Sequence, residues 1–175
     1  MKARAWLCRI AIALGLVAAT VIVAACAGGG SAKFPAVAGS MPAGQSWAGV
    51  YYNPVYGYLH LIEKDGSLVG RWRRTDGSHW GELSGTADGN LMHFTWKEHT
   101  IGAVGPSGEA RGSGVFSYKL PSNSDIAELD GQYALDDSSD IGQWHCVKQN
   151  NIPPDIDSVK GDNPDAPVGG HDKWQ

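Results

Sequence analysis

Two apolar runs and a tight turn decide the fold of this chain, and they lie between residues 47 and 72 in the stretch WAGVYYNPVYGYLHLIEKDGSLVGRW. Within the stretch, apolar and polar residues alternate with the period of two that half-buried strands have. Asp65-Gly66 separates two of the runs, and this dipeptide is a strong hairpin signal because glycine takes the positive φ that a tight turn needs. The pattern predicts three antiparallel strands, at residues 46–53, 57–63 and 68–72.

The same pattern continues through the rest of the core. Five further runs, at residues 78–86, 91–97, 110–118, 126–135 and 141–149, are separated by short turns or by a glycine-rich loop. Eight short strands with local connections predict an all-β, antiparallel up-and-down meander, and closing it into a barrel removes both exposed edges. We therefore expect one β-barrel domain at residues 46–149.

Alternation also predicts which side chains face the inside of the barrel. These are Trp47, Gly49, Tyr51, Asn53, Leu59, Leu61, Leu68, Gly70, Trp72, Leu83, Met92, Phe94, Trp96, Phe116, Tyr118, Leu129, Tyr133, Trp144 and Cys146. The interior of an eight-stranded barrel is either filled by side chains or holds one small ligand. An aromatic lining is compatible with both, so the sequence leaves the two open.

Residues 1–25 have the layout of a bacterial signal peptide. Lys2, Arg4 and Arg9 precede an apolar run at residues 10–25, which is shorter than the roughly 20 residues of a membrane-spanning helix. The run ends in Val23-Ala-Ala-Cys26, which resembles the lipobox of bacterial lipoproteins. The resemblance implies that Cys26 becomes the first mature residue and carries acyl chains. An ordinary cleaved signal and an uncleaved anchor are the alternatives.

The lipid anchor predicts where the protein resides. Two or more acyl chains hold a domain stably at a membrane without any spanning helix. Residue 27 is not Asp, which by resemblance to Gram-negative lipoproteins favours the outer membrane of the cell envelope. Residues 26–45 are small and contain proline, so we expect a flexible tether there. Residues 150–175 are rich in Pro and Asp, and we expect a tail that is disordered or follows the surface.

Composition argues against several classes of function. The formal charge is −4 for the whole chain, and loss of Lys2, Arg4 and Arg9 with the signal takes it to −7. An acidic chain without a basic cluster is not expected to bind nucleic acid or to be drawn to anionic lipid by charge.

Enzyme and metal motifs are missing as well. The six His include no HExxH pair and no Cys/His zinc spacing, and the acids do not follow the EF-hand pattern. Glu98 and His99 are neighbours in a predicted strand, so they should point to opposite faces and not cooperate, and we expect both on the surface. Cys146 is expected to be a small core residue. We therefore predict no catalytic residue, no metal site and no cofactor.

Several segments are similar to avidin and streptavidin. They are Gly49-Val-Tyr-Tyr-Asn53, Asp65-Gly-Ser-Leu-Val-Gly-Arg-Trp72, Leu83-Ser-Gly85, Phe94-Thr-Trp-Lys97 and Ala127-Glu-Leu-Asp-Gly-Gln-Tyr133. The resemblance implies an avidin-like or calycin-like barrel. Asn53 matches the asparagine that meets the biotin ureido group, Trp96 matches a wall tryptophan, and Tyr133 replaces another.

Other positions depart from the avidin pattern. Trp72 stands where that family has a hydrogen-bonding tyrosine, Arg74 where it has a serine, and Gly142 about where it has an aspartate. A buried polar site loses orders of magnitude in affinity when its partners are missing, which argues against biotin. We expect another small, partly apolar ligand, contacted by Tyr51, Asn53, Trp72, Trp96 and Tyr133. The alternative is an accessory lipoprotein that binds an envelope protein and has a filled barrel.

Overall fold

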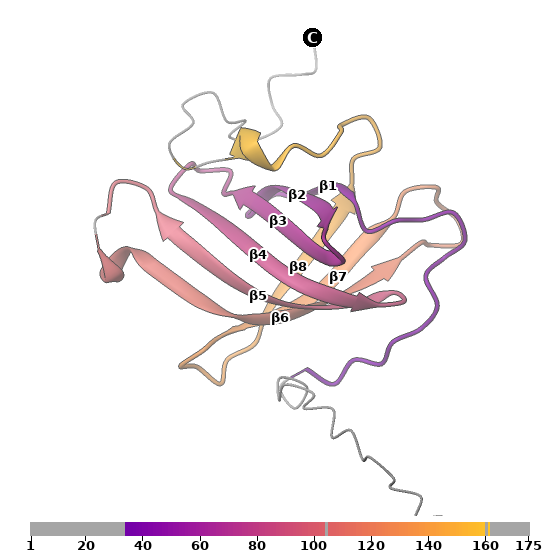
Figure 1. The fold of residues 1–175 in the computed structure, drawn as a ribbon, viewed down its shortest axis with the longest axis horizontal. Coiled ribbons are helices and arrows are strands. Elements are labelled where there is room, and N and C mark those ends of the chain that lie inside the picture. The colour runs from indigo at the N-terminus through magenta and orange to yellow at the C-terminus, as the bar shows by residue number, and fades with distance from the viewer. Residues whose placement is uncertain (1–33, 104, 160, 162–175) are drawn as a thin grey trace, which may run out of the picture.

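The computed structural model describes residues 34–103, 105–159 and 161, and within them the chain forms a closed antiparallel barrel (Figure 1). Its eight strands are β1 (Gly49–Asn53), β2 (Gly57–Lys64), β3 (Ser67–Arg73), β4 (His79–Asp88), β5 (Leu91–Thr100), β6 (Glu109–Lys119), β7 (Glu128–Leu135) and β8 (Gly142–Lys148). Each strand pairs with the next, and β8 pairs with β1. The predicted eight-stranded meander is confirmed.

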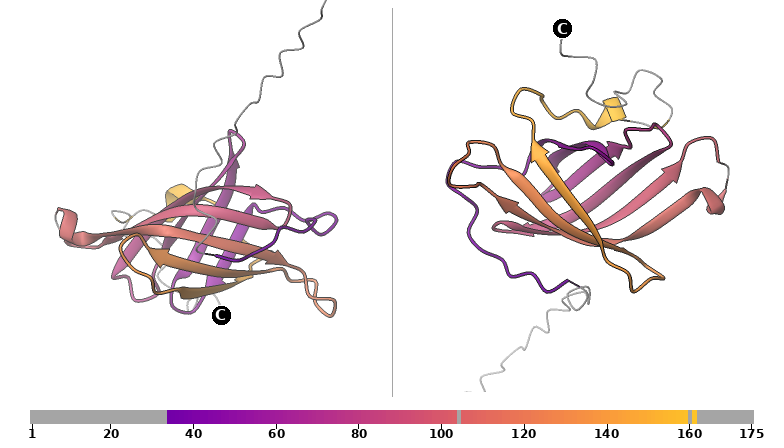
Figure 2. Two further views of the ribbon diagram at one scale, coloured as in Figure 1. Left: turned by 90° about the horizontal axis from the view of Figure 1, so that it is seen from below. Right: turned by 180° about the vertical axis from the view of Figure 1, so that it is seen from behind.

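The turn between β2 and β3 has the predicted geometry. Asp65 and Gly66 have φ angles of 52° and 76°, so both central residues are left-handed, as a type I′ hairpin turn requires. Closure depends on a short ladder in which Tyr51 pairs with Lys148 and Tyr52 with Val147. The back view in Figure 2 shows β7 and β8 on the side of the barrel opposite to β4 and β5.

Aromatic rings fill the inside of the barrel, and several of them occupy the space left by a glycine on the neighbouring strand. Five cross-strand pairs share this arrangement: Trp72 with Gly81, Trp96 with Gly112, Phe94 with Gly114, Phe116 with Gly131, and Tyr133 with Gly142. A Cβ atom at Gly81 would lie 2.2 Å from the Trp72 ring, so that ring occupies the space of the missing side chain. The lumen of this barrel is therefore packed with rings, the first of the two possibilities for an eight-stranded barrel.

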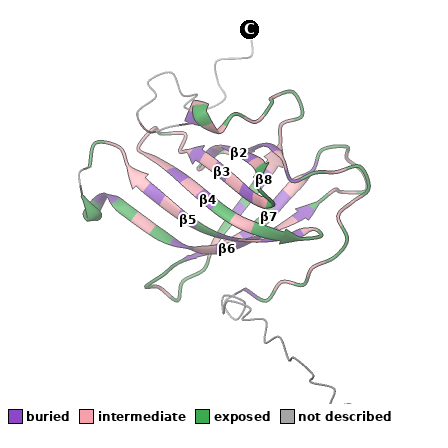
Figure 3. Ribbon diagram, in the orientation of Figure 1, coloured by how far each residue is buried: buried purple, intermediate pink, exposed green. Residues whose placement is uncertain are grey.

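Burial follows the predicted alternation along the strands (Figure 3). All the residues expected to face inward are buried except Asn53 and Tyr133, which are partly exposed. Both lie at the same end of the barrel, which we call the mouth. Its described loops are at residues 54–56, 74–78, 101–103, 105–108 and 136–141.

The segment before β1 covers the opposite end of the barrel. Trp47 donates from Nε1 to the carbonyl of Gly89 at 3.0 Å, and Tyr51 donates its hydroxyl to the carbonyl of Trp47 at 2.8 Å. The Tyr118 hydroxyl donates to Gln45 Oε1 at 2.7 Å. Access to the lumen from this end is therefore blocked by residues 45–47.

The predicted flexible tether and the predicted tail both have described parts, and these parts pack on the outside of the barrel. Within the expected tether, Phe34 is 3% exposed and packs on Leu91, Val115 and Ala134, because a large apolar side chain gains from leaving water. The second half of the expected tether thus lies against the wall. Residues 26–33, including Cys26, are outside the described residues, as is the predicted signal peptide.

The tail follows the surface as far as it is described. It forms a short 3-10 helix, η2 (Ile156–Val159), in which Val159 is 1% exposed. The backbone N–H of Asp155 donates to His60 Nδ1 at 2.9 Å, and Arg71 lies 3.2 Å from Asp157. Of the two expectations for the tail, this part takes the surface path, and residues 162–175 lie outside the description.

Candidate ligand site at the barrel mouth

Five aromatic side chains and one ion pair surround a small cavity just inside the mouth. They are Tyr56, Trp72, Trp96, Tyr133 and Trp144, with Arg74 and Glu98. The cavity has a volume of about 30 Å³. One ordered water needs roughly 10–15 Å³ by the same measure, whereas ligand pockets typically have some 300–1,000 Å³. In this conformation the cavity has room for one or two waters.

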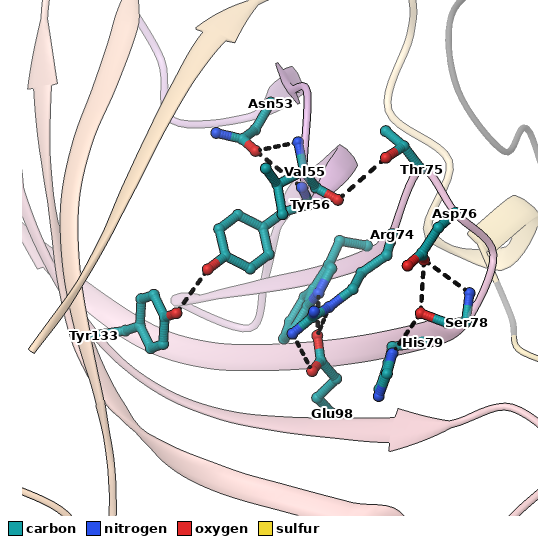
Figure 4. A network of polar contacts seen from close by, with 11 residues as sticks. Asn53, Val55, Tyr56, Arg74, Thr75, Asp76, Ser78, His79, Glu98 and Tyr133 are labelled. Atoms are coloured by element: carbon teal, nitrogen blue, oxygen red, sulfur yellow. Dashed lines mark hydrogen bonds and ion pairs between the residues drawn. The ribbon is translucent and has the colours of Figure 1, made fainter. Parts of the chain in front are cut away.

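The ion pair connects the end of β3 to the end of β5. Arg74 donates from Nη2 to Glu98 Oε1 at 2.8 Å and from Nε to Glu98 Oε2 at 3.0 Å (Figure 4). Trp72 adds a hydrogen bond from Nε1 to Glu98 Oε2 at 3.2 Å. The Glu98 side chain is 9% exposed and that of Arg74 is 31% exposed, so the carboxylate is buried while the guanidinium reaches solvent.

Glu98 keeps Arg74 ionised. Burial lowers the pKa of Arg74, but the hydrogen bonds and the charge of Glu98 outweigh this, and the net pKa is raised. A carboxylate in an aromatic environment would be costly without such a partner. The arrangement presents to the cavity a neutral but strongly polar group among apolar rings.

Tyr56 covers the cavity from the β1–β2 loop. Its hydroxyl lies 2.6 Å from that of Tyr133, and its ring lies 4.8 Å from the Trp144 ring, between centroids. The guanidinium of Arg74 lies 5.5 Å from the ring centroid of Tyr56, within cation–π range. Burial, followed by the bond to Tyr133, raises the pKa of Tyr56, so this hydroxyl is protonated at neutral pH.

Asn53 holds the loop that carries Tyr56. Its Oδ1 accepts from the backbone N–H groups of Val55 at 2.7 Å and Tyr56 at 2.9 Å, and its Nδ2 donates to the carbonyl of His145 at 2.6 Å. Both lone pairs of the amide oxygen are thus used within the protein. Asn53 positions Tyr56 and has little hydrogen-bonding capacity left for a ligand.

The β3–β4 loop is braced in a similar way next to Arg74 (Figure 4). The Asp76 carboxylate accepts from the backbone N–H of Ser78 at 2.9 Å, and hydrogen bonds from Ser78 lower its pKa. Thr75 donates its hydroxyl to the carbonyl of Pro54 at 2.9 Å, which ties this loop to the one carrying Tyr56. The two loops therefore form one support on which Tyr56 and Arg74 face each other.

The structure brings together three of the five residues predicted to contact a ligand. Trp72, Trp96 and Tyr133 line the cavity, whereas Tyr51 is fully buried towards the covered end and Asn53 supports the loop. Ligand binding by these residues stays a prediction.

The predicted surface position of Glu98 is wrong. The residue is 7% exposed and faces the cavity. Strand alternation indicates the inward position of Glu98, because Met92, Phe94 and Trp96 face inward and the period of two continues to residue 98. His99 points the other way and stacks on Trp80 with 4.5 Å between ring centroids, so the two neighbours lie on opposite faces as expected.

No metal-binding cluster accompanies the cavity in the described part of the chain. Among those residues, no group of three or more His, Cys, Asp or Glu side chains could hold a metal ion. Cys146 is completely buried, and burial raises the pKa of its thiol. No helix within residues 34–103, 105–159 and 161 is long and apolar enough to cross a membrane.

Comparisons with family models, curated proteins and solved structures found no match for this chain. The likeness to avidin therefore rests on the eight-stranded meander barrel and on the residues quoted above.

Proposed function

We propose that the protein is a non-catalytic binding module of the bacterial cell envelope, anchored through lipid on Cys26, which holds a small, partly apolar ligand at the barrel mouth. One observation carries the proposal: five aromatic side chains gather around the half-buried Arg74–Glu98 pair at the end of the barrel that residues 45–47 leave uncovered. Apolar walls with a few fixed polar groups are the usual composition of ligand sites.

The ion pair supports a role in binding because a pair of this kind usually adds little to the free energy of unfolding. Desolvating two charges costs about as much as their attraction returns, and well-packed apolar residues would often serve the fold as well. In the mouth, however, Glu98 and Arg74 give an otherwise apolar ring of side chains a fixed hydrogen-bonding orientation. A ligand with one polar group and an apolar body would use both parts.

The rim of the mouth carries three exposed apolar side chains among loop residues that are mostly polar, including Asp136, Asp137 and Asp140. Val55, Leu135 and Ile141 are 55%, 38% and 44% exposed, and they lie on or beside the 54–56 and 136–141 loops. Exposed apolar side chains beside a polar centre give a ligand apolar surface to contact. The apolar body of the ligand would rest on this rim.

The size of the cavity requires Tyr56 to move when the ligand enters. Its ring covers the cavity from a loop of three residues, and a hydroxyl pair with Tyr133 holds it there. Turning this one side chain outward joins the cavity to the rim without disturbing the β-ladder.

A neutral apolar fluorophore tests the proposal. We expect N-phenyl-1-naphthylamine to bind and to quench tryptophan emission, and Trp96→Ala to weaken binding at least tenfold. Tyr56→Ala should tighten binding, because it removes the cover. Trp80→Ala is the matched control on the outer wall and should leave affinity unchanged. If the wild type and Trp96→Ala bound the fluorophore with equal affinity, the mouth would not be the binding site.

A protein partner is the second candidate, and the filled lumen favours it. Within the described chain the rings occupy the inside of the barrel, so a large ligand has no interior space. If this candidate is right, an envelope protein should co-purify from membranes with the wild type and be lost with Val55→Glu/Ile141→Glu, while the fluorophore fails to bind either protein.

The anchor is tested separately from the ligand. Mass spectrometry of the mature N-terminus should find acyl chains on Cys26, and Cys26→Ala should release the protein from membranes. An unmodified mature N-terminus would overturn the anchor and leave the proposed mouth site standing.

A further inference from the structure

A second hollow lies on the outer wall of the barrel. It crosses β3, β4, β5 and β6 and has a volume of about 480 Å³, within the usual range of ligand sites. Ile156 of η2 borders one side and Asp136 of the β7–β8 loop borders the other. This wall faces the reader in Figure 1, with η2 above it and the β7–β8 loop below. We call it the outer groove.

Basic side chains predominate in the outer groove. Lys64, Arg71, Lys97 and Arg111 line it, against two acidic residues, Glu82 and Asp136. The chain as a whole has a formal charge of −4, so a locally basic lining runs against the overall composition. The basic groups of this lining can contact an anionic ligand.

Three of the basic residues and Glu82 form one row across the sheet. Arg71 pairs with Glu82, Glu82 with Lys97, and Lys97 with Arg111. Neighbouring strands lie about 4.8 Å apart, so this row spans roughly 14 Å. A ligand that follows the row has to be extended and has to carry more than one anionic group.

The floor beside this row is polar and low. Ser84 and Thr95 pair directly on β4 and β5, are exposed and have short side chains. Hydroxyl groups on a shallow floor suit a ligand that itself carries many hydroxyls. The centre of a protein interface, by contrast, is usually apolar and rich in aromatic anchors.

The basic groups are held by contacts that a ligand can replace. Arg71 lies 3.2 Å from Asp157, Lys97 lies 3.6 Å from Glu109, and Arg111 lies 3.0 Å from Glu109. Side chains in such partly exposed pairs gain little from pairing. Anionic groups on a ligand can therefore take the place of these carboxylates at small cost.

We propose that the outer groove binds an acidic oligosaccharide, about three sugar units long, laid across β3 to β6. The carboxylate or phosphate groups of the sugars contact Arg71, Lys97 and Arg111, and their hydroxyls contact Ser84 and Thr95. This site lies on the outer face of the wall, and its ligand is independent of the one proposed for the mouth.

The test uses the full-length chain in detergent and calorimetric titration with defined probes. Tetragalacturonate and a phosphorylated maltotetraose represent the two kinds of acidic sugar, and unmodified maltotetraose and tetraglutamate are the controls. We expect at least one acidic sugar to bind, with affinity that falls as salt is raised, and neither control to bind comparably. Lys97→Gln/Arg111→Gln should weaken sugar binding about tenfold, as the loss of two ion contacts predicts.

Two further variants separate the sugar site from general charge. Thr95→Val, which removes a hydroxyl and keeps the shape of the strand residue, should weaken acidic-sugar binding about two- to tenfold. Lys119→Gln is the matched control, because Lys119 is exposed and pairs with Asp130 elsewhere on the barrel. Binding of neither acidic sugar would overturn the proposal. So would equal binding of tetraglutamate, or affinity that is the same for the wild type and Lys97→Gln/Arg111→Gln.

Discussion

Replacement of Arg74 by Met should destabilise the barrel far more than replacement of its partner Glu98 by Gln. Arg74→Met leaves a carboxylate that is 9% exposed with a hydrogen bond from Trp72 but without its counter-charge. Breaking a buried pair in this way typically costs about 3–5 kcal/mol. Because Arg74 is 31% exposed and Trp72 still donates, we place the cost at the lower end, about 3 kcal/mol.

Glu98→Gln should cost much less. The amide oxygen of Gln still accepts from Trp72, and the guanidinium of Arg74 can turn to solvent, so we expect about 1 kcal/mol. In Arg74→Met/Glu98→Gln no buried charge remains, and the loss should be about 2 kcal/mol rather than the sum of the single losses. The coupling between the two sites is then about 2 kcal/mol.

Urea unfolding at pH 7, followed by tryptophan emission, measures these differences directly. The midpoint should shift while the slope of the transition stays constant. Lys97→Met is the matched control on the same strand, since its pair with Glu109 is partly exposed, and it should change stability by less than about 0.5 kcal/mol. Additive losses in the double variant, or an Arg74→Met protein as stable as the control, would refute this account of the mouth.

Three other predictions follow from the packing. Gly81→Ala should cost about 3 kcal/mol in thermal unfolding, because its Cβ would meet the Trp72 ring at 2.2 Å; a loss below 1 kcal/mol would contradict the filled lumen. In a chain that begins at residue 27, the Cys146 thiol should resist iodoacetamide until the protein is unfolded, since it is fully buried and its pKa is raised; rapid labelling of the native protein would contradict this. Burial lowers the pKa of His60, which accepts from Asp155 N–H, so the unfolded chain binds the proton more readily. Stability should therefore fall as the pH drops through about 6.5, and His60→Asn should flatten that dependence; identical urea midpoints for the two proteins from pH 7.5 to 5.5 would refute it.

Most of the fold could be predicted from local patterns. The strands of this barrel are bounded by turn residues, and alternation identified the inward side chains because one face of each strand is buried. The same alternation extends past Trp96 to the end of β5, and it predicts that Glu98 faces inward.

The site could be predicted only in part, because two of its features depend on tertiary contacts. Tyr56 lies in a loop without periodicity, and only the bonds from Asn53 and the packing on Trp144 place it over the cavity. The filling of the lumen depends on which ring lies opposite which glycine, and that follows from the register of strand pairs such as Trp72 with Gly81. The same holds for Phe34, whose partners come from three strands.

The proposed mouth site can be tested most directly by nuclear magnetic resonance, because each tryptophan has its own indole N–H signal. We expect N-phenyl-1-naphthylamine to shift the signals of Trp72 and Trp96, whose rings line the cavity. The signal of Trp47 should stay unchanged, because its indole N–H donates to the Gly89 carbonyl at the covered end. A spectrum in which the Trp72 and Trp96 signals stay fixed at saturating probe would contradict the account.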